Sequence, residues 1–422
     1  MTASGLIVSG PEAPAPSARV RRIDWRTLLI GFFGLLTLLS VVEVITGDNT
    51  LLSSGQMNAA VLAAVPIGLA ALGGLWSERA GVVNIGLEGM MILGTWFGAW
   101  GALQFDNPWI GALVGVIGGA LGGLLHAVAT VTFGVDQIVS GVAIILLGTG
   151  ITQFLSAAVF ADMPGGGEIQ SPPLPRMGTI PTGGLTDPLL TLERKDIFLV
   201  SDLAGVLYGL FTGMSQLTLV AILLVPFTWW VLWRTAFGLR LRSCGEHPIA
   251  AESLGVNVYY YKYVAVTISG ALSGLGGAFL AIVMNNQYRD GQTAGRGFIG
   301  LAAMIFGNWR PAGLAGGAGL FGYMDAMRLR GGSAAVHALL LAFAIGLAIF
   351  AIWRFYKGSR TAAIASGVAA IGMYLIYANT DTVPQQFLYF APHITTLIVL
   401  AMFSQHLRMP AADGRPYRRG EE

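Results

Sequence analysis

The chain has 422 residues, of which 54% are hydrophobic and only 11% are charged. Soluble domains carry about 25% charged residues, so this composition excludes an ordinary soluble domain and indicates a protein embedded in lipid. A net charge of +2 argues against a nucleic-acid partner, and a single cysteine, Cys244, excludes an intramolecular disulfide framework.

Apolar runs dominate the chain from its first tenth to its end. Residues 1–26 are rich in Ala, Pro and Ser and predict a disordered cytoplasmic tail, not a cleaved signal peptide. Runs near the length of a spanning helix, about 20 residues, lie at 27–46, 56–75, 82–103, 109–131, 137–160, 216–233, 263–283, 335–353, 361–379 and 389–406. Two shorter pieces within 298–327, separated at 308–311, predict a broken hairpin. The predicted fold is all-α: a polytopic membrane protein with about ten core transmembrane helices plus a two-helix hairpin.

Lys and Arg residues are placed unevenly along the connections. Most of the 24 fall on one side if both chain termini lie in the cytoplasm, which the positive-inside rule favours. The long connection 161–216 is then an external loop, with an interfacial helix expected at 197–211. The polar connection 234–262 is cytoplasmic.

Glycines recur at every fourth position in two of the spans. They are Gly111, Gly115, Gly119 and Gly123 in one run, and Gly270 and Gly274 in another. Small residues at this spacing let helix backbones approach closely in lipid, so tight helix packing is predicted.

The cytoplasmic connection 234–262 contains the signals of a short helix. Pro248 suits a first helical turn and Gly255 suits a left-handed helix end, which predicts a helix at 248–254. Such a helix is either a docking element for a motor domain or a merely structural loop. The candidate coupling residues are Gly245, Glu246, His247, Pro248, Ala250, Ala251, Glu252 and Gly255.

Several runs resemble one transporter family. The run FGLRLRSCGEHPIAAESLGVNV is similar to the coupling-helix loop of ABC importer permeases of the branched-chain amino acid/ribose-type superfamily. The runs GLWSERAGVVNIGLEGMMILG (74–94), SGALSGLGGAFLAI with GQTAGRGFIGLAAMIFGNWRPAG (269–313) and APHITTLIVLAMF with PYRRG (391–420) resemble its nucleoside/simple-sugar branch. The resemblance covers most of 50–330 and the last 40 residues.

This resemblance implies a permease subunit of an importer for nucleosides or simple sugars in a bacterial plasma membrane. Its expected partners are a cytoplasmic ATPase dimer, a second homologous permease, an extracellular substrate-binding lipoprotein and membrane lipid. One departure stands out. A hairpin at 331–380 separates the permease core, 27–330, from the final transmembrane helix, 381–407, and the cytoplasmic tail, 408–422, and it has the pattern of an insertion.

Two polar clusters are candidates for the substrate path. Asn84 and Glu88 are four residues apart, so on a helix they share one face, either along the path or with Glu88 bound to an interhelical partner. Asn285 and Gln287, at an external mouth, suit the hydrogen-bonding groups of a nucleoside, although an ordinary solvated loop would look the same. His126, within an apolar run, is expected to make an interhelical hydrogen bond.

The sequence contains no GxxxxGK[ST] motif, so ATP is expected to bind a separate subunit, and neither a cofactor nor a metal site is predicted. No HExxH or GxSxG motif suggests an enzyme. The alternative function is a stand-alone ion- or proton-coupled secondary transporter, which would favour buried acid pairs and paired broken helices in two related halves.

Overall fold

The computed structural model describes residues 25–381, 383 and 407–419, and the regular elements in this part of the chain are helices. The α-helices are α1 (Trp25–Thr46), α2 (Ser54–Arg79), α3 (Leu87–Gln104), α4 (Pro108–Ala127), α5 (Gln137–Leu155), α6 (Gly183–Glu193), α7 (Val200–Phe211), α8 (Gln216–Arg234), α9 (Ala236–Glu246), α10 (Pro248–Ser253), α11 (Val258–Phe279), α12 (Arg296–Phe306), α13 (Pro311–Ala326), α14 (Gly332–Tyr356) and α15 (Arg360–Ala378). Short π-helical turns extend four of them: η1 (Val128–Thr132), η2 (Ser156–Phe160), η3 (Leu280–Met284) and η4 (Met327–Gly331). The predicted all-α fold is confirmed.

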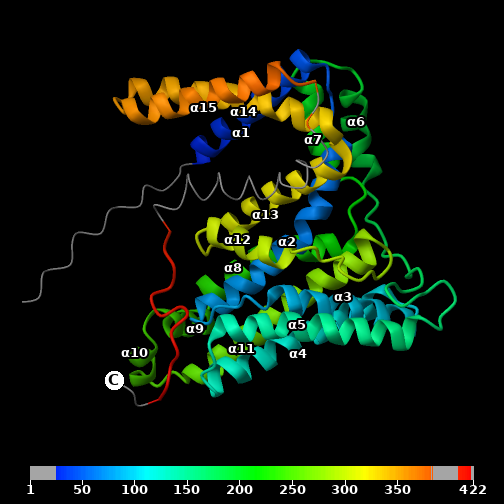
Figure 1. Ribbon diagram of the computed structural model, residues 1–422, viewed down its shortest axis with the longest axis vertical. Coiled ribbons are helices and arrows are strands. Elements are labelled where there is room, and N and C mark those ends of the chain that lie inside the picture. Colours follow the sequence, from blue (N-terminus) through cyan, green and yellow to red (C-terminus); the bar gives the residue numbers. More distant parts are fainter. Residues whose placement is uncertain (1–24, 382, 384–406, 420–422) are drawn as a thin grey trace, which may run out of the picture.

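Eight helices within the described residues are long and apolar enough to cross a bilayer. They are α1, α2, α4 with η1, α5 with η2, α8, α11 with η3, α14 and α15. The shorter α3, α12 and α13 complete the bundle, and the last two form the predicted broken hairpin (Figure 1). The chain is therefore a multi-pass membrane protein. The predicted tail was 1–26, but α1 already begins at Trp25. Residues 1–24 and the predicted last span at 389–406 lie outside the described residues.

Helices α2 and α11 form the centre of the bundle. In their spans, 72% and 78% of the most apolar window is buried, and the two helices pack against each other. Helix α11 also packs on α3 and α4, whereas α2 also packs on α12 and α13. The predicted glycine faces meet here. A Cβ atom added to Gly119 on α4 would lie 2.3 Å from the carbonyl oxygen of Gly270 on α11, and one added to Gly274 would lie 2.4 Å from that of Gly115. Backbone-to-backbone contact between α4 and α11 therefore requires glycine.

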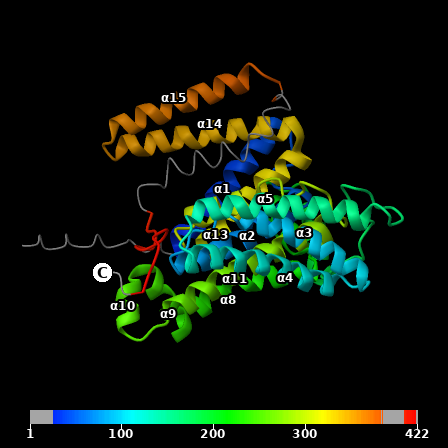
Figure 2. The same cartoon turned by 60° about the horizontal axis from the view of Figure 1, so that its bottom comes forward.

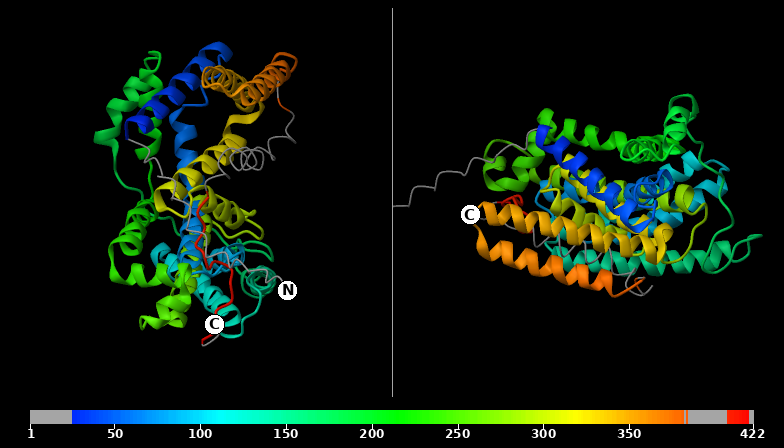
Figure 3. Two further views of the ribbon diagram at one scale, coloured as in Figure 1. Left: turned by 90° about the vertical axis from the view of Figure 1, so that its left-hand side faces the viewer. Right: turned by 90° about the horizontal axis from the view of Figure 1, so that it is seen from above.

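The hairpin α14–α15 lies along one side of the molecule. Figures 2 and 3 show it beside α1, away from α4 and α11. Helix α14 packs on α1 and on η4, whereas only 6% of the α15 window is buried. Its exposed apolar side chains, including Ile364, Val368 and Ile371, suit contact with lipid. The hairpin therefore lies at the periphery of the described fold.

The connection 161–216 holds two helices instead of one. The predicted helix at 197–211 is present as α7, and α6 precedes it. Helix α7 packs on the first turn of α2, where a Cβ atom on Gly209 would lie 2.3 Å from the carbonyl oxygen of Ser54. The two helices therefore cover the beginning of α2.

One predicted helix begins later than its apolar run. The run at 82–103 becomes helical only at Leu87, because the chain turns at Gly81, whose φ is +80°, and continues without helical hydrogen bonding through Asn84. The expectation that Asn84 and Glu88 share one helical face is therefore wrong. Side chains from distant helices bind this stretch of backbone, and a periodicity argument cannot detect them.

We expect Gly119→Ala to lower stability by about 1–3 kcal/mol, because the added methyl group forces α4 away from α11. Thermal unfolding of the detergent-solubilised protein measures this loss. Gly150→Ala on α5 is the matched control, since nothing lies within 4 Å of the added Cβ atom. Equal melting temperatures for the two variants would contradict the close approach.

Candidate functional site

The stretch between α2 and α3 enters the bundle without the hydrogen bonds of a helix. Unsatisfied backbone groups are costly in an apolar surrounding, so they need other partners. Side chains of α2, α4, α5 and α11 supply them. Ser77 Oγ donates to the Val82 carbonyl oxygen (2.6 Å), Gln137 Oε1 accepts from the Val83 N–H (2.6 Å), His126 Nε2 contacts the Val83 carbonyl oxygen (3.1 Å) and Lys262 Nζ donates to the Gly81 carbonyl oxygen (3.2 Å).

His126 makes the interhelical hydrogen bond expected of it. If Nε2 carries the proton and donates to Val83, then Nδ1 accepts from the Ser140 hydroxyl group, 2.9 Å away. Both ring nitrogens are thus used in joining α4, α5 and the extended stretch. The contacts assign His126 to structure rather than to proton transfer.

Asn84 is fully buried at the end of the extended stretch. Its Nδ2 donates to Ser269 Oγ on α11 at 2.9 Å, whereas its Oδ1 has no hydrogen-bond partner among the described residues. A buried acceptor without a partner is uncommon. Asn84 therefore offers a free oxygen in the interior of the bundle.

Glu88 joins the beginnings of α3 and α12. Its Oε1 accepts from the Gly295 N–H at 2.9 Å, and its Oε2 accepts from the Gly297 N–H at 2.6 Å. Carboxylates are favourable at helix N-termini, where backbone N–H groups lack helical partners. The interhelical partner of Glu88 is therefore a helix terminus, not the basic side chain that a buried ion pair would require.

A buried ion-pair network follows directly after this cap. Arg296 Nη2 lies 2.6 Å from Asp325 Oδ2, and Arg328 Nη2 lies 2.9 Å from Asp325 Oδ1. These residues were not predicted as a site, although three charged residues near an apolar hairpin indicate one. The network fixes the first turn of α12 against the end of α13.

The polar cluster at 285–292 folds onto the segment 169–174. Gln287 Nε2 donates to the Ser171 carbonyl oxygen at 2.6 Å, and Asn285 Nδ2 donates to Gln292 Oε1 at 2.9 Å. The next residue, Tyr288, is 1% exposed in the apolar core. Both amide groups predicted for the substrate path therefore make intramolecular hydrogen bonds, and Gln292 belongs to the same connection as Gly295, which Glu88 binds.

The predicted coupling helix is present as α10. Pro248 occupies its first turn, and Gly255 follows it with a φ of +80°, as expected. Helix α9 was not predicted; it follows α8 after a turn capped by Thr235. The glycines and arginines of this segment are typical of a loop. Thr235, a residue type that caps helices, and the later Leu241 nevertheless indicate a helix.

The predicted coupling residues differ in exposure. Gly245 and Ala251 are buried, Pro248 and Glu252 are half-buried, and Glu246, His247, Ala250 and Gly255 are exposed. A Cβ atom on Gly245 would lie 2.4 Å from the Arg79 carbonyl oxygen, so α9 rests directly on the end of α2. The largest exposed apolar side chains here are Ile249 (54%) and Leu254 (85%), which the sequence analysis did not select.

Arg79 and Trp309 connect this region to the broken hairpin. Arg79 Nη2 donates to the Trp309 carbonyl oxygen at 2.6 Å, and Arg79 Nη1 lies 3.8 Å from Glu246 Oε1. The Trp309 indole N–H donates to Glu78 Oε2 at 2.5 Å. The end of α2, α9 and the turn between α12 and α13 therefore form one contact network.

Residues 407–419 pack over the same network. Asp413 is 7% exposed and lies near the Glu78 carboxyl group. Burial raises the pKa of Asp413 to about 7, although Lys262 and Arg79 nearby favour the charged form. Burial therefore favours the protonated form of this carboxyl group.

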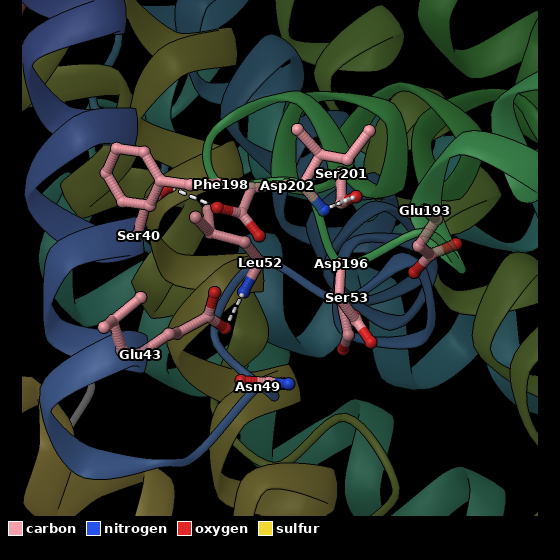
Figure 4. A pocket seen from close by; sticks show the side chains of 12 residues that line it. Ser40, Glu43, Asn49, Leu52, Ser53, Glu193, Asp196, Phe198, Ser201 and Asp202 are labelled. Atoms are coloured by element: carbon pink, nitrogen blue, oxygen red, sulfur yellow. Dashed lines mark hydrogen bonds between the residues drawn. The ribbon is translucent and has the colours of Figure 1, made fainter.

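A separate pocket of about 360 Å³ lies at the C-terminal end of α1 (Figure 4). Its described lining includes the carboxyl groups of Glu43, Glu193, Asp196 and Asp202. Ser40 Oγ donates to Asp202, and Glu43 Oε1 accepts from the Leu52 N–H at 3.0 Å. None of the predicted substrate-path or coupling residues is in this lining.

The bundle of apolar helices is that of a multi-pass membrane protein. The family model for the branched-chain amino acid transport system / permease component matches residues 56–351, and the chain belongs to this family. The match ends inside α14. Membership favours a permease subunit of an ABC importer over a stand-alone secondary transporter.

Three curated relatives are similar over most of their lengths. The guanosine ABC transporter permease protein NupQ of Bacillus subtilis is 34% identical over 369 residues, covering 86% of this chain and 96% of the relative. The nucleoside ABC transporter permease protein NupC of Lactococcus lactis is 33% identical over 83% of this chain and 93% of the relative. The putative glucose ABC transporter permease protein TsgC13 of Haloferax volcanii is 36% identical over 280 residues, covering 66% of this chain and 78% of the relative. No solved structure matches the chain.

We expect Glu88→Gln to lower stability by about 1.5–3 kcal/mol, since an amide group would turn a donor toward one of the two N–H groups of α12. Thermal unfolding in detergent measures the loss, and Glu168→Gln, at an exposed position, is the control. Unchanged stability with altered uptake would contradict the capping role and favour a direct place on the substrate path.

We expect the attachment of residues 407–419 to weaken as pH rises through about 7, the folded-state pKa of Asp413. The pKa of Asp413 is higher in the packed state than in the detached state, so protonation favours packing. The stabilisation of the packed segment by Asp413 is therefore complete below the usual aspartate pKa and is lost as pH rises through about 7. Protection factors for the backbone amides of Ala411 and Ala412, corrected for intrinsic exchange, measure it. Asp413→Asn should flatten the dependence between pH 5 and 8 (about one unit or more either side of the transition), and an unchanged slope would refute this role.

Proposed function

We propose that this permease imports nucleosides or simple sugars, using ATP bound by a separate cytoplasmic ATPase dimer. A second permease completes the translocation path, and an extracellular binding lipoprotein delivers the substrate. The names of the similar relatives, which include guanosine, nucleoside and glucose permeases, support this substrate range. Both chain termini then lie in the cytoplasm, with α9, α10 and residues 407–419 on that face.

The observation that carries the proposal is the exposed apolar surface of α10. Ile249 and Leu254 are more than half exposed on a short helix whose other side is anchored through buried Ala251. Large apolar side chains on a polar connection suit burial in a partner's groove, where a few residues supply most of the binding energy. Helix α10 is therefore the proposed contact with the ATPase.

Movement of α10 has a contiguous route to the interior of the bundle. Helix α9 rests on the end of α2 at Gly245, and Arg79 connects both to the turn before α13. The extended stretch after Gly81 continues to Asn84 and Glu88, and Glu88 holds the start of α12. Closure of the ATPase dimer can thus shift the beginnings of α3 and α12 together.

The proposed substrate path includes Asn84, Glu88, Asn285 and Gln287. Within this set, Asn84 is the direct candidate for a substrate hydroxyl group, because its buried Oδ1 lacks a partner among the described residues. Glu88 acts through the position of α12 rather than by free contact with substrate. Asn285 and Gln287 would shape the outer mouth through the loop that they stabilise.

We expect the double variant Ile249→Asp/Leu254→Asp to weaken ATPase association by roughly 2 kcal/mol or more, as for a truncated interface hot spot. Co-purification with the ATPase subunit and ATP-driven uptake of a labelled nucleoside and a labelled hexose in proteoliposomes measure the effect. The conservative variant Ile249→Leu/Leu254→Met keeps the apolar surface and should retain both activities. Normal association and uptake by the aspartate variant would remove α10 as the docking element.

A further inference from the structure

Residues 407–419 cross the cytoplasmic end of the bundle and touch three separate parts of it. The Arg408 N–H donates to Asn308 Oδ1 at 2.7 Å, in the turn between α12 and α13. The Ala412 N–H donates to the Gly245 carbonyl oxygen at 2.9 Å, at the end of α9. Tyr417 donates its hydroxyl hydrogen bond to Glu252 of α10. Figure 1 shows this segment in red beside α9 and α10.

Glu252 is the point at which this segment holds α10. Besides the Tyr417 hydroxyl group, its carboxylate meets Arg419 Nε at 2.8 Å. The Arg419 side chain is 80% exposed, so its ion pair contributes little in water. A hydroxyl group bound to a carboxylate makes a stronger, charge-assisted hydrogen bond, which makes Tyr417 the main contact.

Tyr417 is itself held by α11. Its ring centroid lies 5.6 Å from that of Tyr259, and Lys262 Nζ lies 6.0 Å from the ring centroid. Lys262 also donates to the Gly81 carbonyl oxygen, at the beginning of the extended stretch. Tyr417 thus connects α10 with the start of α11. Through Lys262 it is also connected to the turn after α2.

Helix α10 needs such support because it is short. It has six residues, fewer than two full turns, and packs mainly on α9 and α11. A helix of this length has few internal hydrogen bonds, so its orientation depends on what holds it. The segment 407–419 binds Glu252 of this helix and leaves Ile249 and Leu254 exposed.

We infer that residues 407–419 form a brace that holds α10 in its docking orientation and joins it to the turn between α12 and α13. Tyr417 and Glu252 are positioning residues of this brace, which rests on the proposed function of α10. Force applied to α10 then reaches the broken hairpin by two routes, through Arg79 and through Asn308. Loss of the Tyr417–Glu252 bond uncouples ATP hydrolysis from transport without removing the docking surface.

The test uses the assembled transporter in liposomes, with its ATPase, second permease and binding protein. We compare Tyr417→Phe, Glu252→Gln and the double variant for substrate uptake per ATP hydrolysed. Tyr417→Phe should lower this ratio by roughly tenfold or more, the factor that corresponds to losing one hydrogen bond to a charged group. The double variant should be no worse than the more affected single variant, because both changes act on one bond.

Arg415→Gln is the matched control, since Arg415 is exposed in the same segment, and it should transport as the unmodified protein does. Co-purification of the ATPase separates uncoupling from loss of docking, and the inference requires normal co-purification of Tyr417→Phe. A wild-type coupling ratio in Tyr417→Phe, or effects that add in the double variant, would overturn the brace while leaving the proposed function intact. Failure of the unmodified complex to take up nucleosides and sugars would overturn the proposed function itself.

Discussion

Satisfaction of backbone hydrogen bonds where the chain is not helical is the constraint on which this structure depends. An apolar surrounding supplies no water for a free N–H or carbonyl group, so every such group needs a protein partner. The stretch after Gly81 finds its partners on four helices, among them His126, Gln137 and Lys262. These contacts set the relative positions of α2, α4, α5 and α11 around one short piece of chain.

The same constraint explains the second break in the bundle. Helix α12 begins inside the molecule, and Glu88 provides the acceptors for its first N–H groups. Arg296 and Asp325 then fix that helix against α13. Because Glu88 also belongs to the first turn of α3, the two breaks form one joint, and the extended stretch connects this joint to the contacts between α2, α9 and the turn before α13. A permease that changes shape needs such a path between its motor and its interior.

Features of this fold that depend on local backbone preferences could be predicted from the sequence, whereas those that depend on contacts between distant helices could not. Helix α10 was predictable because Pro248 and Gly255 act locally, through backbone angles that each residue favours. The faces containing Gly119 and Gly270 were predictable as packing surfaces, although not as each other's partners. Helix α9 was missed because its composition resembles a loop. The shared face of Asn84 and Glu88 was wrong because contacts from distant helices outweighed the helical period.

The sequence by itself determined the membrane class, the all-α fold, most of the spans and the family, because these follow from apolar run length and from ordered local motifs. The tertiary structure decided what the polar residues contact. It placed Glu88 on a helix terminus and left the Asn84 oxygen without a partner among the described residues. It also brought Tyr417 onto Glu252 across more than 160 positions of chain. Such contacts depend on the relative placement of several helices, which no local pattern in the chain encodes.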